Sequence, residues 1–441
     1  MKPGTIVALA SGAGRAGVAV IRLSGPHAGA TLRALTDRDL PPPRQAARRA
    51  FCEPHSGLSL DDGLALWFPG PASFTGEDVA ELHVHGGPAV IAAMVEACLS
   101  QPGVRPAEPG EFTRRAFENG KLDLAEAEGL ADLVEAETEG QRRQALRQRR
   151  GGLSARFEAW RARLIEAAAL IEAEIDFPDE GLPGGLAARA GPLLEHLAAD
   201  LANCLDDGHR GERVRDGYRI AIIGPPNVGK SSLLNKLAQR EAAIVSALPG
   251  TTRDVVEVRL ILAGFPVWIA DTAGLREAAD AIEAEGVRRA LERAEEADLR
   301  LGLVEAGAEP PAALLAALRP GDVLIRSKSD LHRAPASSSS AERWVSVVTG
   351  EGIAEMEQLL AARVAETLGR EEAPALSRAR HRQRIAEAHG ALLRAIAALG
   401  YGPELAAEEA RLAASAIGRL TGRIDVEELL GEVFASFCIG K

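Results

Sequence analysis

The chain has little of what marks several classes of protein. Its four cysteines are scattered and form no Cys-x-x-Cys pair, so the sequence predicts neither a zinc site nor a disulfide framework. No apolar run approaches the ~18 residues that a membrane-spanning helix needs, and the first residues lack the basic and apolar segments of a signal peptide. We therefore expect a cytoplasmic protein with reduced thiols and no membrane partner.

The chain has no excess of positive charge, and aromatic side chains make up only 4% of it. The net charge of −12 argues against a broad nucleic-acid-binding surface, so any RNA contact is expected to be local or supplied by a partner. Apolar residues make up 46% and charged residues 26% of the chain, which is typical of a globular protein. Its 441 residues predict about three domains.

The periodicity of the apolar residues changes along the chain. The first part alternates turns with short strand-like runs and one helix near 88–99, which indicates an α+β domain. Helical periodicity follows, interrupted by the Pro/Gly-rich stretch Phe177–Gly185, and it returns at the end of the chain. Strands and helices alternate in between, so we predict an α/β domain inserted into an all-α helical domain. The predicted bounds are 1–118, 119–210, 211–372 and 373–441. The strand-like runs of the first domain are Thr5–Leu9, Val18–Leu23, Leu64–Phe68 and Val79–Val84.

The segment Gly224–Ser231 has the spacing of a phosphate-binding loop. It reads Gly-x-x-x-x-Gly-Lys-Ser between an expected strand, Arg219–Ile223, and an expected helix, Ser232–Leu237. Backbone N–H groups and the helix N-terminus of such a loop hold phosphates. We expect Lys230 to reach the β- and γ-phosphates and the Ser231 hydroxyl to bind Mg²⁺.

The other elements of a guanine-nucleotide site follow in order. Asp271–Gly274 ends an expected strand, where the carboxylate faces Mg²⁺ through water and the Gly274 amide senses the γ-phosphate. Pro249–Asp254 is a candidate switch with a threonine that closes over the metal. Ser327–Asp330 stands where G proteins carry Asn-Lys-x-Asp, and the Asp330 carboxylate can accept both guanine N–H donors. A run at 346–348 is expected over the base edge. The predicted GTP-binding residues are Asn227, Val228, Gly229, Lys230, Ser231, Ser232, Ser246, Ala247, Leu248, Pro249, Gly250, Thr251, Thr252, Asp271, Thr272, Ala273, Gly274, Lys328, Asp330, Ser346, Val347 and Val348.

Two positions depart from the usual pattern. Ser327 replaces an asparagine, so one amide contact to guanine and to the phosphate loop is expected to be shortened or lost, and Ser327→Asn should raise nucleotide affinity. Leu275 stands where many GTPases carry the glutamine that orients water. A monovalent cation beside Asn227 can neutralise charge instead. Further candidates are Arg276, Glu277 and Glu283, for each of which a solvated surface charge is the alternative.

Together these residues resemble the MnmE (TrmE) family of tRNA-modification GTPases over essentially the whole chain. The resemblance also rests on stretches outside the nucleotide elements: Thr5–Ala8, Val20–Gly25, Phe74–Asp78, His85–Pro88, Pro109–Phe117, Asn119–Leu124 and Phe437–Lys441. It implies a homodimer with a folate-binding N-terminal domain, a helical domain and an inserted G domain. It also implies potassium-stimulated GTP hydrolysis through G-domain dimerisation. The implied partner is an FAD-containing MnmG (GidA)-like protein in a heterotetramer, which modifies the wobble uridine of certain tRNAs with a carboxymethylaminomethyl or aminomethyl group. A tetrahydrofolate derivative, 5-formyl or methylene, is the implied one-carbon carrier.

The resemblance also implies residue roles. Glu283 corresponds to the glutamate that helps to place the catalytic water, and Arg276 lies in its switch. A carboxylate such as Glu81 suits the donor-rich pterin of folate. The implied potassium ligands are Asn227, Ser246, Leu248 (backbone) and Thr251; the magnesium ligands are Ser231 and Thr252; the folate residues are Arg22, Glu81, Lys121 and Lys441.

Other patterns have simpler interpretations. Gly12–Gly17 spells Gly-x-Gly-x-x-Gly but precedes a strand, so it predicts a hairpin turn rather than a dinucleotide site. His83 and His85 share a strand face without a third metal ligand, which favours a structural role. The basic run Arg142–Arg150 is expected to be a solvated helix face, with a tRNA or partner contact as the alternative. Cys438 is either a nucleophile or a half-buried hydrophobe.

Two other functions share some of these features. A ribosome-assembly GTPase would share the nucleotide elements but normally adds a small RNA-binding module, which is not evident here. A stand-alone folate-dependent aminomethyl transferase would not need the inserted G domain.

Overall fold

The computed structural model describes residues 4–176, 185–240, 257–271, 294–332, 342–369, 375–400 and 402–424, together with Val433, Phe434, Phe437 and Gly440. The chain packs as two compact units. The first comprises Met1–Ala131, Arg149–Ala162 and Ala414–Lys441, and the second comprises Asp132–Gln148 and Arg163–Ala413. Within the described ranges, no helix is both long and apolar enough to cross a bilayer.

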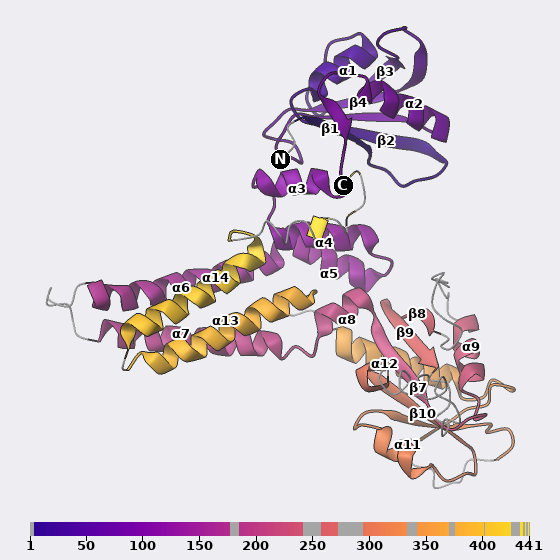
Figure 1. Ribbon diagram of the computed structural model, residues 1–441. Helices are drawn as coiled ribbons and strands as arrows, with labels where there is room; N and C mark the ends of the chain where they lie inside the picture. The colour runs from indigo at the N-terminus through magenta and orange to yellow at the C-terminus, as the bar shows by residue number, and fades with distance from the viewer. Residues whose placement is uncertain are drawn as a thin grey trace, which may run out of the picture. The chain divides into compact units, whose positions relative to one another are not determined.

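The first unit is built on a six-stranded sheet in the order β3-β4-β5-β2-β1-β6 (Figure 1). Neighbouring strands are antiparallel except for the parallel pair β1 and β6. Two helices pack on the sheet and bury an apolar core that includes Leu23, Leu32 and Leu82. The strands are β1 Thr5–Leu9, β2 Ala16–Ser24, β3 Ala47–Cys52, β4 Ser59–Phe68, β5 Val79–Gly86 and β6 Val104–Pro106, and the packed helices are α1 Ala28–Thr36 and α2 Pro88–Leu99.

This arrangement confirms the α+β prediction, but the expectation of a single helix is wrong. Besides α2, the unit contains α1 and a third helix, α3 Glu111–Glu118. Both are short, and four of the eight residues of α3 are charged, so the sequence offers only a brief apolar pattern. The segment between β1 and β2 is a hairpin turn, as predicted for the Gly-rich run, because Leu9 pairs with Ile21 across antiparallel strands.

The end of the chain packs beside the start of α4 (Leu124–Glu135). Phe434 and Phe437 form a buried cluster with Leu124 and Ala127. Gly110 lies against this cluster with a φ of 65°, and a Cβ there would meet the Phe434 carbonyl oxygen at 2.6 Å. A glycine is therefore needed where α3 begins.

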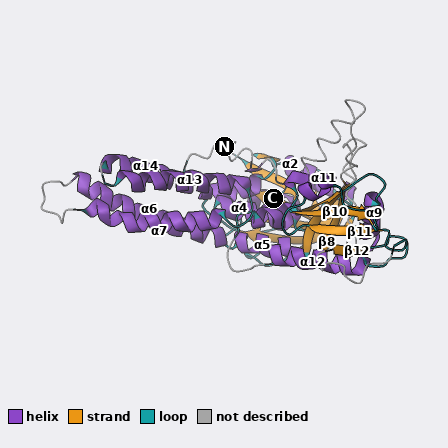
Figure 2. Ribbon diagram, turned by 90° about the horizontal axis from the view of Figure 1, so that it is seen from below, coloured by secondary structure: helices purple, strands orange, loops and turns teal. Residues whose placement is uncertain are grey.

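The long helices combine segments from before and after the α/β portion. Helix α13 (Ala379–Ala398) packs along α7 (Leu186–Leu205), and α14 (Pro403–Thr421) lies beside α6 (Gly152–Asp176) in both views (Figures 1 and 2). Helix α6 ends and α7 begins on either side of the predicted Pro/Gly break. The remaining helices here are α5 Glu139–Arg149 and α8 Arg210–Asp216. The packing of the two helical halves on each other is therefore as predicted.

The α/β portion contains a second six-stranded sheet in the order β12-β11-β10-β7-β9-β8. All neighbours are parallel except β8 and β9, which form an antiparallel pair. Apolar cores lie on both faces, which explains the nearly unbroken apolar runs of β7 and β10. The strands are β7 Tyr218–Ile223, β8 Glu257–Leu262, β9 Phe265–Asp271, β10 Leu299–Glu305, β11 Val323–Ser327 and β12 Glu342–Trp344, with helices α9 Lys230–Arg240, α11 Ala312–Ala317 and α12 Ile353–Leu368. The carboxyl ends of β7, β9 and β11 meet at one edge, where such sheets bind ligands.

Candidate nucleotide and folate sites

The phosphate loop connects the end of β7 to the start of α9. Gly224 has a φ of 152°, and a Cβ there would meet the Leu303 carbonyl oxygen at 2.3 Å, so only glycine allows the loop to leave the sheet this close to β10. Asn227 adopts a left-handed φ of 61°, and its side chain is exposed. The loop thus projects a polar amide from its tip.

Lys230 is almost completely buried beneath this loop, at 6% exposure. Its Nζ donates hydrogen bonds to the carbonyl oxygens of Gly224 (3.0 Å) and Pro225 (2.8 Å). Burial lowers the pKa of the ammonium, and the carboxylate of Asp271 partly opposes that shift. The site therefore holds a desolvated cation next to the backbone of the loop, where phosphate charge can be neutralised.

The first hydroxyl of α9 faces the last residue of β9. Ser231 Oγ donates a hydrogen bond to Oδ2 of Asp271, which is 7% exposed. The other carboxylate oxygen, Oδ1, is buried and has no hydrogen-bond partner within the described part of the chain. A hydroxyl and a carboxylate with a free lone pair are the hard oxygen ligands that Mg²⁺ prefers, so these residues fit the ion.

The candidate guanine-recognition segment begins at the carboxyl end of β11. Lys328 has a left-handed φ of 56° and pairs with Glu305 at 2.9 Å. Asp330 Oδ1 accepts a hydrogen bond from Ser346 Oγ at 2.5 Å, and Ser346 is fully buried. Val347 is half-buried, whereas the side chain of Val348 is 86% exposed. The fold thus brings Asp330 and Ser346 together from two loops.

Ser327 corrects one expectation from the sequence. Its buried Oγ donates to the carbonyl oxygen of Val228, in the phosphate loop, at 2.7 Å. The contact to the loop, which was expected to be shortened or lost, is therefore kept, because the strand end lies close enough for a short hydroxyl to reach the loop. The carbonyl oxygen of Val304 lies 3.2 Å from the same hydroxyl.

Three of the candidate folate residues contact one another or a common loop. Arg22 on β2 and Glu81 on β5 are cross-strand partners whose side chains pair at 2.9 Å. The Arg22 guanidinium also lies 5.9 Å from the centroid of the Phe74 ring. Lys121 donates from Nζ to the Pro71 carbonyl oxygen at 2.9 Å, and so contacts the segment that carries Phe74. Charged side chains and an aromatic ring thus lie close together where β2 ends and β5 begins.

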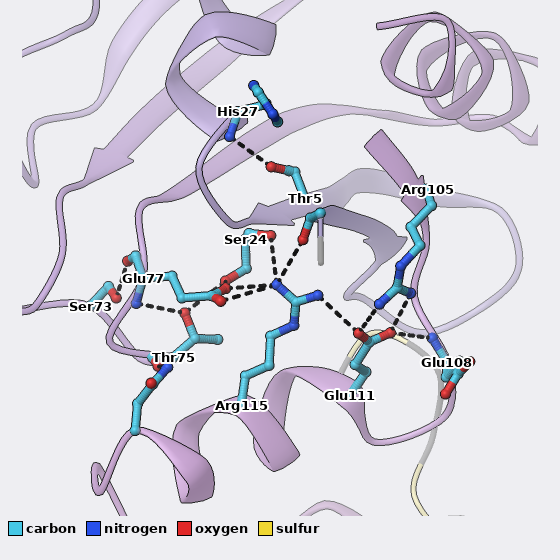
Figure 3. Close-up of polar contacts among 12 residues, drawn as sticks. Thr5, Ser24, His27, Ser73, Thr75, Glu77, Arg105, Glu108, Glu111 and Arg115 are labelled. Carbon is cyan, nitrogen blue, oxygen red and sulfur yellow. Dashed lines mark hydrogen bonds and ion pairs between the residues drawn. The ribbon is translucent and has the colours of Figure 1, made fainter. Parts of the chain in front are cut away.

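A buried network of charges supports that segment (Figure 3). Arg115 on α3, at 4% exposure, pairs with Glu77 and Glu111, each at 2.9 Å. Arg105 donates to Glu111 at 2.8 Å. Burial would raise the pKa of Glu111, but hydrogen bonds from Arg105, the Glu108 amide and Arg115 outweigh it and hold that pKa at about 2. Glu111 is therefore ionised at every ordinary pH.

The network continues into the 70–78 segment. Ser24 Oγ donates to Glu77 at 2.6 Å and lies 2.7 Å from the hydroxyl of Thr75, and both hydroxyl residues are fully buried. Asn119 Nδ2 donates to the Thr75 carbonyl oxygen at 2.7 Å. The sequence predicts no role for these side chains, because sequence alone does not separate buried charges from solvated ones.

Several candidate residues lie outside the described ranges: Ser246, Ala247, Leu248, Pro249, Gly250, Thr251, Thr252, Thr272, Ala273, Gly274, Arg276, Glu283 and Lys441, as well as Leu275, Glu277 and Cys438. The candidate switch, the catalytic pair and most of the potassium ligands therefore stay predictions. Of the other positions singled out, His83 Nε2 lies 3.3 Å from Glu81, and His85 Nδ1 lies 2.8 Å from Asp61. Arg142 pairs with Glu139 on the exposed surface of α5.

Two family models together match nearly the whole chain. A family model described as GTP-binding protein TrmE N-terminus matches residues 5–121, and one described as MnmE helical domain matches residues 124–438. The chain is 59% identical to the tRNA modification GTPase MnmE of Parvibaculum lavamentivorans, over 99% of this chain and all of the relative. It is 55% identical to that of Phenylobacterium zucineum, over 99% of each chain.

Solved structures give weaker likenesses. The G domain of the T. maritima FeoB iron transporter is 24% identical, with 34% of this chain and 98% of that chain covered and a TM-score of 0.26. Aquifex aeolicus Era bound to GDP and aluminium fluoride is 22% identical, with 40% and 66% covered and a TM-score of 0.28. The full-length identities, rather than these likenesses, decide the assignment. The chain belongs to the MnmE family of tRNA modification GTPases.

Proposed function

We propose that this protein is a potassium-stimulated GTP hydrolase that works with an FAD-dependent MnmG/GidA-like partner on tRNA. Together they would add a carboxymethylaminomethyl or aminomethyl group to the wobble uridine of certain tRNAs, with a tetrahydrofolate derivative as one-carbon carrier. The observation that carries the proposal is the 59% identity over the whole chain to a tRNA modification GTPase, in a protein whose phosphate loop sets Ser231 against Asp271. The proposed domain bounds are those predicted from the sequence.

The nucleotide chemistry is assigned to residues at the carboxyl edge of the second sheet. The buried ammonium of Lys230 would offset phosphate charge, and Ser231, Asp271 and Thr252 would hold Mg²⁺ directly or through water. When bound, Mg²⁺ neutralises charge on the β- and γ-phosphates. Asp330 would accept hydrogen bonds from guanine. Water placement is assigned to Glu283 and Arg276, and potassium to Asn227, Ser246, Leu248 and Thr251.

Folate recognition is assigned to the first unit. Arg22, Lys121 and Lys441 would bind the carboxylates of the folate, and Glu81 would pair with its pterin donors. The support is the Arg22–Glu81 ion pair beside Phe74, in which both side chains stay partly exposed, at 22% and 18%. We further propose a cytoplasmic homodimer that forms a heterotetramer with the MnmG-like partner.

Steady-state GTP turnover of the full chain in KCl and in NaCl of equal ionic strength tests the hydrolase. We expect faster turnover in potassium, and we expect Asn227→Ala to abolish that difference because the exposed loop amide is removed. The matched control is Asn235→Ala, on the exposed surface of α9, which should keep it. Equal rates in the two salts would contradict the potassium proposal.

Two further measurements test the tRNA role. We expect 5-formyltetrahydrofolate to bind the full chain and the Arg22→Ala variant to bind it more weakly. A strain that lacks the protein should lose the wobble-uridine modification, as measured by mass spectrometry of digested tRNA. Unchanged tRNA in that strain would exclude the proposed pathway, whatever the GTPase assay shows.

A further inference from the structure

A single hydroxyl ties the candidate base-recognition strand to the phosphate loop. Ser327 is the last residue of β11 and is only 3% exposed. Its Oγ lies 2.7 Å from the Val228 carbonyl oxygen and 3.2 Å from that of Val304. The contact joins positions 99 residues apart, so it links two elements that the sequence order separates.

The hydrogen-bonding capacity of this hydroxyl is small. A serine hydroxyl carries one proton, whereas an asparagine amide carries two N–H donors. Both oxygens near Ser327 Oγ are carbonyls, which only accept. The one proton is therefore used inside the protein, on the closer oxygen of Val228, and none is left for a ligand.

The lack of a free proton on Ser327 limits which edge of guanine the Ser327–Asp330 segment can bind. Guanine presents N7 and O6 as acceptors on one edge, and it presents N1–H and N2–H₂ as donors on the other. Asp330, an acceptor when ionised, suits the donor edge. A side chain that reads N7 must donate a proton, and Ser327 has none available.

We propose that Ser327 is a positioning residue that holds the phosphate loop to the base-recognition strand and leaves the N7 atom of bound guanine unrecognised. The proposal rests on the proposed assignment of the guanine site to Ser327, Lys328 and Asp330. It means that guanine is selected through its donor edge, with Asp330 as the discriminating side chain. An asparagine at position 327 would keep the contact to Val228 with one N–H and donate to N7 with the other.

The test compares GDP with 7-deaza-GDP, in which a C–H group replaces N7. Diphosphates avoid turnover during the measurement. Dissociation constants of the full-length wild-type chain, measured with Mg²⁺ by isothermal titration calorimetry, should agree within about twofold for the two nucleotides. A wild-type preference for GDP of about fivefold or more, a typical effect of one hydrogen bond, would overturn the proposal.

Variants separate the two roles of the residue. Ser327→Asn should bind GDP about three- to tenfold more tightly than 7-deaza-GDP, and Ser327→Ala should weaken both nucleotides equally because the tie to the loop is lost. The matched control is Ser329→Asn, two residues further on, which should keep the wild-type ratio. A Ser327→Asn protein that binds both nucleotides equally well would overturn the proposal. Binding of neither nucleotide by the wild type would instead overturn the guanine site itself.

Discussion

Asp271 shows how much of the nucleotide site depends on single side chains. One carboxylate oxygen accepts from Ser231, the other has no partner within the described ranges, and the charge lies near the buried Lys230. An amide of the same shape can keep the hydrogen bond from Ser231, but it lacks the charge that binds a divalent cation. Removal of this charge should therefore weaken metal binding while it leaves the shape of the site nearly unchanged.

We predict that Asp271→Asn lowers kcat for GTP by about two orders of magnitude or more, because charge stabilisation by a metal contributes several kcal/mol. The loss should be partly overcome by raised Mg²⁺ concentration, while GDP affinity in EDTA changes little. The control is Asp206→Asn, an exposed residue just after α7. Wild-type turnover by Asp271→Asn would exclude a role in metal binding.

Glu111 makes the stability of the first unit depend on pH. Its folded-state pKa of about 2 lies below the ordinary glutamate value of 4.5. The ionised group therefore stabilises the fold fully above about pH 4.5, and this contribution is lost as the pH falls toward 2.

We predict that Glu111→Gln lowers the free energy of unfolding by about 2–3 kcal/mol at pH 7, because it removes the carboxylate that Arg105 and Arg115 share. The difference from the wild type should shrink between pH 4.5 and 2. Urea unfolding followed by circular dichroism at several pH values measures it. Glu96→Gln, on the exposed surface of α2, serves as the control. A difference independent of pH would show that the charge of Glu111 is not responsible.

At the scale of elements, the β8–β9 hairpin packs closely on the start of α5. The amide of Gly140 donates to the Gly264 carbonyl oxygen at 2.9 Å, and a Cβ at position 140 would lie 2.4 Å from the Phe265 ring. Alanine is ordinarily preferred over glycine within helices. Here the contact with the hairpin outweighs that preference.

We predict that Gly140→Ala destabilises the protein by about 1–3 kcal/mol, because the Phe265 ring must move. The matched substitution Gly390→Ala, within α13, meets only the flexible end of Arg394 at 3.5 Å and should be neutral or stabilising by up to about 1 kcal/mol. Differential scanning calorimetry of the two variants measures both effects. Equal shifts of the melting temperature would contradict the packing argument.

Strands and helices with long apolar patterns could be predicted from the sequence, whereas some short ones could not. The buried strands β7 and β9 and the helix α2 were found because each is a continuous or periodic apolar run. Helix α3 could not be predicted because it is short and half charged, and its buried Arg115 pairs with Glu77, which is 38 residues away in the sequence. The phosphate loop could be predicted because its function depends on spacing within eight residues. The tie from Ser327 to the loop could not, since no local pattern encodes a contact across 99 residues.

At the scale of the molecule, one carboxylate joins three distant segments of the second unit. Asp132 accepts hydrogen bonds from Arg215, at the end of α8, and from Arg378, just before α13. Its side chain is 9% exposed. The segments that lead into and out of the α/β portion thus share one buried anion.

We predict that Asp132→Asn lowers the free energy of unfolding of the second unit by about 2–4 kcal/mol, since two arginines lose the buried carboxylate that they share. The matched control is Asp216→Asn, which also removes a carboxylate beside Arg215 but one that is 53% exposed. It should cost less than about 1 kcal/mol. Chemical denaturation of both full-length variants measures the two free energies of unfolding. Equal decreases would contradict the argument that the buried contacts of Asp132 stabilise the unit more than the exposed contact of Asp216.

The packing of α7 on α13 has a consequence for synthesis on the ribosome. About 170 residues separate the end of α7 from the start of α13. At about 5–20 residues per second, translation leaves α7 without this partner for roughly 10–35 s. The parallel sheet between them finds its strands within its own stretch of chain and can fold during that interval. The leucines of α7 that end up buried, such as Leu194, Leu197 and Leu201, therefore lack the cover of α13 during that interval.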